Sequence, residues 1–256
     1  MSHLLLEPQD KVLTVTINRP DIGNAFNGEL IAELTALFSA VPESAHVIVI
    51  AGAGKHFCAG ADLGWMKQTA SFGKVENAAD ARRLAGLFEA VDACPKPVVG
   101  RIHGAARGGG VGLVATMDIP VASESASFAL TEVRLGLAPA VISPFVVRKI
   151  GVARARELFL TGETFGARDA LSYGLVNHVV ADAELDAKVT ERVKLLLMGG
   201  PNALAACKDL ARTVTRLADD DAIVKTANLI AELRASDEAQ DGMRAFLTKT
   251  PPRWMK

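Results

Sequence analysis

The order of strand-like and helix-like segments constrains the fold of this chain more than any other feature. VLTVTIN (12–18) alternates apolar and polar residues as a half-buried strand does, and HVIVIAG (46–52) is the short apolar run of a buried strand. Residues 28–40, between them, place apolar side chains on one helical face. The alternation continues, with strands expected at 97–104, 117–123 and 175–180 and helices at 76–93 and from 143 onward.

The last third of the chain differs from the rest. After about residue 183 every pattern is helical, with breaks at Pro201 and at the acids 219–221. Strands that alternate with helices, followed by helices alone, predict an α/β core over 1–195 and a helical region over 196–256. Within the core, SPFVVRKIG (143–151) predicts a helix with Ser143 as N-cap.

Composition excludes several classes of function. Among 256 residues, 28 Lys and Arg stand against 29 Asp and Glu, so no basic field draws the chain to nucleic acid. No apolar run approaches the roughly 18 residues that span a bilayer, and the N-terminus lacks the pattern of a signal peptide. Three scattered cysteines and five histidines, without CxxC or HExxH, argue against disulfides and a metal site. We therefore expect a cytoplasmic protein without nucleic-acid, membrane or metal partners.

The glycine-rich stretch HGAARGGGVGL (103–113) needs an explanation, because each Gly in a helix lowers helix stability by about 1 kcal/mol relative to Ala. A Gly-rich loop before a helix exposes unpaired backbone N–H groups, which can bind a developing oxyanion without any side chain. HFCAGADLGWM (56–66) is a second candidate loop of this kind. The alternative is that both loops only allow close helix–sheet packing, and composition alone favours that alternative.

Two nucleotide-binding motifs are excluded because residues that they require are missing. GAGKHF (52–57) follows a predicted strand, but a P-loop needs Gly where Val49 stands and Ser or Thr where His56 stands. A dinucleotide fingerprint needs a third Gly where Phe57 stands. No GxSxG occurs, so a nucleophile elbow is also unsupported.

FCAGADL, followed by HGAARGGGVGL and then FALTEVRLGLAP, gives three ordered motifs. Together they resemble the enoyl-CoA hydratase/isomerase (crotonase) family, and the resemblance extends from RPDIGNAFN to FLTKTPPRW. It implies an α/β fold, a spiral of ββα units with a helical C-terminal trimerisation region, in homotrimers or dimers of trimers. It also implies acyl-CoA thioester substrates, with coenzyme A as part of the substrate and no separate cofactor.

The resemblance gives the two loops a backbone role. It places the thioester carbonyl between the N–H groups of Ala61 and Gly109, which suit the charge of a thioester enolate. Family hydratases carry a glutamate three residues after the second donor, and this chain has Gly112 there. The loop therefore supplies donors but no acid–base group.

Glu132 matches the family's other catalytic glutamate. Its apolar neighbours predict a raised pKa, as suits a general acid or base: Leu130, Val133, Leu135 and Leu137. The alternative is a surface carboxylate paired with Arg134.

Motif position also implies a set of substrate-binding residues: Ala25, Ala59, Asp62, Leu63, Trp65, Met66, Gly108, Gly110, Pro139 and Lys249. Lys249 would reach the CoA phosphates, from a neighbouring subunit if the chain assembles. Trp65 and Met66 would line the acyl pocket, although core packing explains them equally well.

One glutamate allows two chemistries, hydration of a 2-enoyl-CoA or isomerisation of a 3-enoyl-CoA. GGGVGL and EVRLGLAPAVISPFVVRKIG are similar to bacterial 3-methylglutaconyl-CoA and carboxygeranoyl-CoA hydratases of leucine and terpene breakdown, which favours hydration. Such substrates carry a second carboxylate, for which Arg107 is the candidate cation, although a surface or structural arginine is the more common case. A non-catalytic acyl-CoA-binding protein, suggested by Gly112, and a structural or RNA-binding role are the competing classes.

Overall fold

The computed structural model describes residues 2–255. A six-stranded sheet has the order β1–β2–β3–β4–β6–β9, in which β1 and β2 pair antiparallel and every other neighbouring pair is parallel. These strands are Leu4–Gln9, Val12–Ile17, Val47–Gly52, Val98–Ile102, Ile119–Ser123 and His178–Val180.

A second sheet consists of three short strands, all of which come after β4 in the sequence. It has the order β5–β7–β8, formed by Ala105–Arg107, Ser127–Ala129 and Thr164–Gly166. The chain turns into β5 at Gly104, which has φ +58, and a Cβ there would lie 3.1 Å from the Cα of His56. Glycine at this turn brings β5 against the segment after β3.

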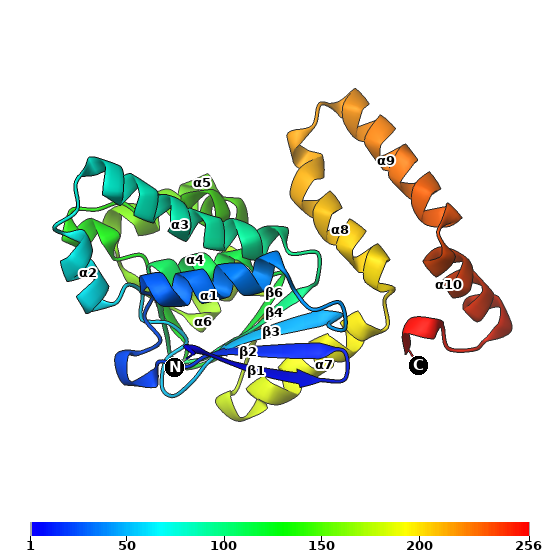
Figure 1. Cartoon of the computed structure of the whole chain (residues 1–256), viewed down its shortest axis with the longest axis horizontal. Coiled ribbons are helices and arrows are strands. Elements are labelled where there is room, and N and C mark those ends of the chain that lie inside the picture. Colours follow the sequence, from blue (N-terminus) through cyan, green and yellow to red (C-terminus); the bar gives the residue numbers. More distant parts are fainter. Residues whose placement is uncertain (1, 256) are drawn as a thin grey trace.

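Helices cover both faces of the large sheet (Figure 1). Ile48 and Ile50 of β3 belong to the main core with α1, α3 and α4, whereas Val47 and Val49 pack with Val189 of α7. The apolar run HVIVIAG is therefore buried on both faces, as a central parallel strand requires. The core helices are α1 (Gly28–Ser39), α2 (Leu63–Thr69), α3 (Lys74–Ala93), α4 (Gly109–Thr116), α5 (Ser143–Thr161), α6 (Ala167–Tyr173) and α7 (Leu185–Leu197).

Helix α5 corrects one sequence prediction. The hydroxyl of Ser143 donates to the carbonyl of Ala140 at 2.8 Å, and Ile142 is the N-cap residue without a side-chain cap bond. Gly151 ends the first part of the helix as expected, with φ +74, but helical structure resumes beyond this kink as far as Thr161.

The last three helices, α8 (Pro201–Thr213), α9 (Asp219–Ala235) and α10 (Asp237–Thr248), extend away from the sheets (Figure 1). Lys208 of α8 pairs with Asp118 at 2.8 Å, and the indole N–H of Trp254 donates to the carbonyl of Met198. Large apolar side chains remain exposed on α9 and α10: Ile223, Val224, Ile230, Met243, Phe246 and Leu247. The predicted α/β core with a helical C-terminal part is confirmed.

The boundary predicted after residue 195 falls near the end of α7, which packs on the sheet as far as Val193. Between residues 2 and 255 no helix has both the length and the apolar character needed to cross a membrane.

Candidate active site

Both glycine-rich loops border one cavity of 360 Å³, here called the central cavity. Its walls are the segment Ala59–Ala61, helices α2 and α3, the start of α4 and the segment after β7 that carries Glu132. A second space of 210 Å³, the inner hollow, shares Ala61, Gly109 and Glu132 and continues to Pro139 and Ile142. The two spaces share part of their lining, and both are mainly apolar, the inner hollow more so.

Local hydrogen bonds fix the first loop. The amide of Phe26 donates to the carbonyl of Gly60 at 2.7 Å, and the amide of Asp62 donates to the carbonyl of Phe26 at 2.9 Å. Asp62 is the N-cap of α2 and accepts from the amides of Gly64 and Trp65. This pairing turns the intervening amide of Ala61 away from Phe26, and among residues 2–255 it has no hydrogen-bond acceptor.

The guanidinium of Arg19 holds the same loop from the side. It forms a 2.9 Å ion pair with Asp62 and donates to the carbonyl of Ala25. The bonds from Gly64, Trp65 and Arg19 outweigh the cost of burial and lower the pKa of Asp62. Asp62 therefore stays ionised at the start of α2, where the helix dipole also favours negative charge.

In the second loop, the amide of Gly109 is unpaired for a different reason. Gly108 adopts φ +48 and its amide donates to the carbonyl of Ala129, so Gly109 begins α4 with no earlier helical turn to receive its N–H. No described residue accepts from the Gly109 amide. A Cβ on Gly109 would lie 3.1 Å from the Phe26 ring, and one on Gly110 would lie 2.6 Å from the carbonyl of Cys58. Close approach of these loops therefore requires glycine.

Glu132 begins a short 3₁₀ helix (Glu132–Leu135) beside these amides. Its Oε2 is buried without a hydrogen-bond partner, and burial raises the pKa of the carboxyl group. It forms no ion pair with Arg134 or any other described residue, so the surface ion pair is not the arrangement seen.

The apolar setting predicted from neighbouring residues is only partly present. Leu130 is buried, whereas Val133, Leu135 and Leu137 are exposed. Leu135 and Leu137 nevertheless line the central cavity with Glu132. The Glu132 carboxylate also lies against the backbone of Gly108, where a Cβ would stand 3.1 Å from Oε1.

The position of Gly112 is filled by other side chains. A Cβ there would lie 2.8 Å from the Cβ of Ile142, closer still to its Cγ2, and 3.3 Å from Phe88. A carboxylate side chain could not enter this space. Asp80 of α3 is a second carboxylate in the lining of the central cavity; it is 8% exposed and pairs with Arg83 at 2.7 Å, beside which it also borders a neighbouring hollow.

Sequence reasoning missed the wall formed by α3. Asn77, Asp80, Ala81 and Leu84 line the central cavity at helical spacing, so one face of α3 faces it. The spacing alone predicts such a face without saying what it faces. Thr69, Thr131 and Val141 also line the central cavity and were not predicted as binding residues, although Thr131 lies in FALTEVRLGLAP and Val141 in EVRLGLAPAVISPFVVRKIG.

The predicted binding residues fall into two groups. Ala59, Trp65, Met66 and Gly108 line the central cavity, and Pro139 lines the inner hollow. The others border neither space: Ala25, Asp62, Leu63, Gly110 and Lys249.

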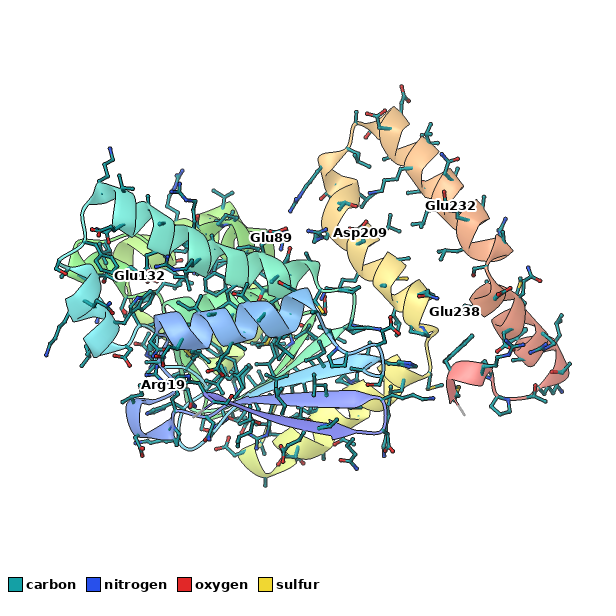
Figure 2. All side chains as sticks on the ribbon, in the orientation of Figure 1. Arg19, Glu89, Glu132, Asp209, Glu232 and Glu238 are labelled. Atoms are coloured by element: carbon teal, nitrogen blue, oxygen red, sulfur yellow. The ribbon has the colours of Figure 1, made fainter. Side chains whose placement is uncertain are left out.

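Lys249 caps α10, on the opposite side of the chain from α2 and α3 (Figure 1). Figure 2 shows the same separation between Glu132 and the C-terminal helices that carry Glu232 and Glu238. A contact between Lys249 and a ligand in the central cavity thus requires a second copy of the chain.

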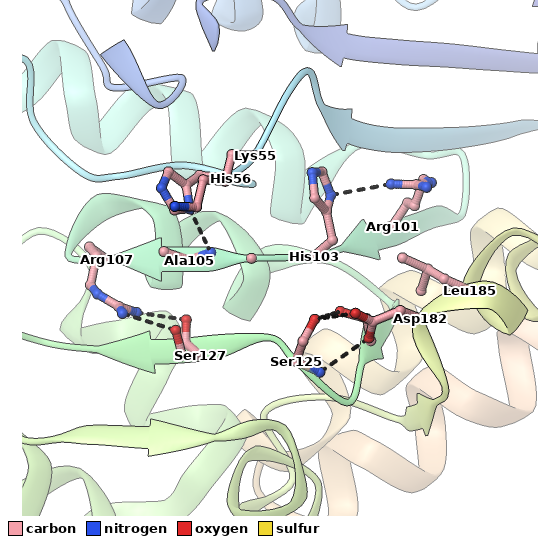
Figure 3. Close-up of a pocket in the computed structure, with 12 residues that line it drawn as sticks. Lys55, His56, Arg101, His103, Ala105, Arg107, Ser125, Ser127, Asp182 and Leu185 are labelled. Atoms are coloured by element: carbon pink, nitrogen blue, oxygen red, sulfur yellow. Dashed lines mark hydrogen bonds between the residues drawn. The ribbon is translucent and has the colours of Figure 1, made fainter. Parts of the chain in front are cut away.

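Arg107 contributes to the lining of the central cavity, but its guanidinium is held by hydrogen bonds to Ser127. Its guanidinium donates to the carbonyl of Ser127 at 2.6 Å and to the hydroxyl of Ser127 at 2.9 Å, in a different hollow (Figure 3). The suggested role of Arg107 as partner of a substrate carboxylate stays a prediction, because the residue borders the central cavity while Ser127 already occupies part of its guanidinium.

The sequence and the fold of this chain are similar to those of known enoyl-CoA hydratases. The family described as enoyl-CoA hydratase/isomerase matches residues 7–256. An enoyl-CoA hydratase of Alternaria alternata is 36% identical over 93% of this chain and 79% of its own length. A mevalonyl-coenzyme A hydratase of Aspergillus fumigatus is 33% identical, over 96% of this chain and 92% of its own length. The crystal structure of an enoyl-CoA hydratase from Shewanella pealeana is similar with a TM-score of 0.95 at 37% identity, over 99% of this chain and 96% of that chain.

Proposed function

Because this chain belongs to the enoyl-CoA hydratase/isomerase family, we propose that it adds water across the 2,3 double bond of a 2-enoyl-CoA. The observation that carries the proposal is the meeting of two unpaired amides, of Ala61 and Gly109, with the buried carboxyl of Glu132 at one cavity. Two amides can bind the thioester oxygen as it gains charge, and one such donor contributes about 10²–10³ in rate where it has been tested. The start of α4 adds the positive end of its dipole at Gly109.

We assign the proton transfers to Glu132. The oxygen of a water molecule bonds to C3 of the substrate while its proton passes to the Glu132 carboxylate, and the resulting enolate takes that proton at C2. The raised pKa of Glu132 suits both halves of this cycle, because the group must accept and then release a proton near neutral pH.

The attacking water needs a second hydrogen-bond acceptor, since Gly112 offers no side chain. Asp80 is the other carboxylate that lines the central cavity, and Arg83 holds it. We assign it to positioning the water. Isomerisation of a 3-enoyl-CoA remains the alternative, since it needs Glu132 but no water.

Asp80→Asn should therefore reduce kcat for hydration by about ten- to a hundred-fold, because a misplaced reactant costs rates of that order. Isomerisation of a 3-enoyl-CoA by the same variant, where measurable, should be unchanged, since that reaction uses no water. Asp92→Asn is the matched control, because Asp92 is equally buried on α3 but pairs with Arg148 outside the cavity. Equal loss in both variants, or no loss in Asp80→Asn, would contradict the assignment.

The acyl chain that we propose is short and branched at C3. The inner hollow is lined by apolar groups that include Leu84, Leu137, Pro139 and Ile142, and its 210 Å³ limits the chain length. A relative named for mevalonyl-coenzyme A supports a branched substrate. Asp80 in the cavity wall disfavours a second carboxylate on the substrate, since like charges repel.

Loss of conjugated enoyl-thioester absorbance tests the function. We expect turnover of crotonyl-CoA and faster turnover of 3-methylcrotonyl-CoA, with 3-methylglutaconyl-CoA slower than both. Gain of absorbance from a 3-enoyl-CoA with no loss from any 2-enoyl-CoA would replace hydratase by isomerase. Binding of CoA without turnover of any of them would identify a non-catalytic relative.

The trimer or dimer of trimers, the cytoplasmic location and a role in leucine breakdown stay predictions. The exposed apolar side chains of α9 and α10 are the surface that such an assembly would cover. A light-scattering mass equal to one chain would argue against it.

A further inference from the structure

A hollow of 560 Å³ lies beside β5 and is here called the basic hollow (Figure 3). Lys55 and His56 border it from the loop after β3, and Arg107 borders it from β5. Serines 123, 125 and 127, together with Asp182, line the opposite wall. The proposed hydratase reaction uses none of these side chains.

Arg107 carries a half-buried charge that no carboxylate balances. Its guanidinium donates to the carbonyls of Ala106 and Ser127 and to the hydroxyl of Ser127, and it has no ion pair within residues 2–255. Burial lowers its pKa, although an arginine remains protonated at neutral pH. Partly buried charges in proteins are usually paired, so the missing counter-charge points to an anion.

His56 presents a hydrogen-bond donor beside Arg107. The amide of Ala105 donates to Nδ1 of His56 at 3.2 Å, so the neutral ring carries its proton on Nε2. No described residue accepts from Nε2. Burial lowers the pKa of His56, and the charges of Lys55 and Arg107 lower it further, which is the effect of a positive field without neutralisation.

The other polar groups of the basic hollow have hydrogen-bond or ion-pair partners of their own. Arg101 pairs with Asp186 at 2.5 Å and donates to Nδ1 of His103, whose Nε2–H donates to the carbonyl of Gly54. Asp182 accepts from the hydroxyl of Ser125 at 2.6 Å. Cationic side chains without a carboxylate partner therefore lie at the end of the hollow that holds Lys55, His56 and Arg107, whereas Asp182 at the other end is bonded to Ser125 and pairs with no cation of the described chain (Figure 3).

We propose that this end of the basic hollow binds the phosphate group of a phosphate monoester. The donors available to it are the Lys55 ammonium, Nε2–H of His56, the remaining N–H groups of Arg107 and the hydroxyl hydrogen of Ser127. A tetrahedral group with several strong acceptor oxygens uses such a divergent set of donors better than a planar carboxylate does. The volume lies within the range of small-ligand sites, so the organic part of the ester fits toward Asp182.

Calorimetric titration with inorganic phosphate and with adenosine 3′,5′-bisphosphate tests the site. Wild type should bind one equivalent at millimolar or lower concentration. Lys55→Met should bind about ten-fold more weakly, since one charge-assisted bond is lost, and Arg107→Met more weakly still. Lys194→Met is the control, because Lys194 is exposed on α7 away from the hollow. No binding by wild type, or equal affinity in wild type and Lys55→Met, would overturn the proposal.

The phosphate has two possible sources, a separate metabolite or the 3′-phosphate of a CoA thioester. If CoA supplies it, Lys55→Met weakens binding of CoA but not of dephospho-CoA. If the ligand is separate, both bind Lys55→Met as they bind wild type, and phosphate still titrates in the presence of CoA. Lys55 is exposed and unpaired in the described chain, so this variant tests the site even if Arg107→Met does not fold. These titrations need no turnover, so their outcome is independent of the hydratase proposal.

Discussion

Glu132→Gln should abolish most of the hydratase activity, with kcat lower by about 10²–10⁴-fold, the usual contribution of a general acid–base group. Gln has the same shape as Glu but cannot take the proton of water or return it to C2. KM should change little, because the amides of Ala61 and Gly109 remain in place. Steady-state assays of the conjugated thioester measure both constants, and Glu124→Gln, at a surface ion pair with Arg168, is the control. Activity equal to wild type would remove Glu132 from the mechanism.

The pH profile gives an independent readout of the same group. The reaction needs an ionised Glu132, and burial raises its pKa above the ordinary 4.5. The acidic limb of kcat/KM should therefore lie at higher pH than for an exposed glutamate, and it should vanish from the residual activity of Glu132→Gln.

The raised pKa also predicts the direction in which Glu132→Gln changes the free energy of unfolding. A carboxyl pKa that is raised on folding means that the native state binds the proton more tightly than the unfolded chain does. Its burial cost is fully present above the folded pKa, shrinks as pH falls below that value, and is gone below the ordinary pKa of 4.5, where both states are protonated. Glu132→Gln should thus unfold no more easily than wild type at neutral pH, so that lost activity cannot be ascribed to unfolding.

Gly112→Ala should destabilise the fold by about 1–3 kcal/mol, the cost of overpacking a filled core. Helix propensity acts in the opposite direction, favouring Ala by about 1 kcal/mol within α4. The clash prevails because the new Cβ would stand 2.8 Å from the Cβ of Ile142 and closer still to its Cγ2, below any ordinary contact. Urea unfolding measures the difference.

A double-mutant cycle tests whether Ile142 is the cause. Ile142→Ala alone should cost about 2–5 kcal/mol through the cavity it creates. The double variant should be more stable than the sum of the single effects predicts, by about 0.5–3 kcal/mol, since the added methyl enters the space that Cγ2 leaves. Additive effects would show that Gly112 and Ile142 do not compete for one space.

The long elements could be predicted because their pattern is local. HVIVIAG became β3, and the helical face of residues 28–40 became α1 with Leu30, Ile31 and Leu34 buried. Strand β1 was missed because only Leu4 of its six residues is buried, which leaves no alternation to detect. The three strands of the small sheet have three residues each, too few for any period, and exist through pairing across the chain.

The candidate site could likewise be predicted only in part. The resemblance indicated Ala61, Gly109 and Glu132, and the fold brings all three to one cavity. Asp80 escaped notice because an acidic residue on a polar helix has no local sign of what it faces. The contact between Gly112 and Ile142 joins residues on different helices, so the sequence shows the missing glutamate but not what fills its place.

The two free amides have a further consequence for how this protein can change by mutation. A main-chain N–H survives every side-chain replacement except proline, so the proposed donor at residue 61 is insulated from ordinary point substitution. The methyl group of Ala61, by contrast, forms part of the wall of both the central cavity and the inner hollow. Substitution at residue 61 can thus change which acyl chains the cavity accepts, while the N–H group proposed to bind the thioester oxygen is kept.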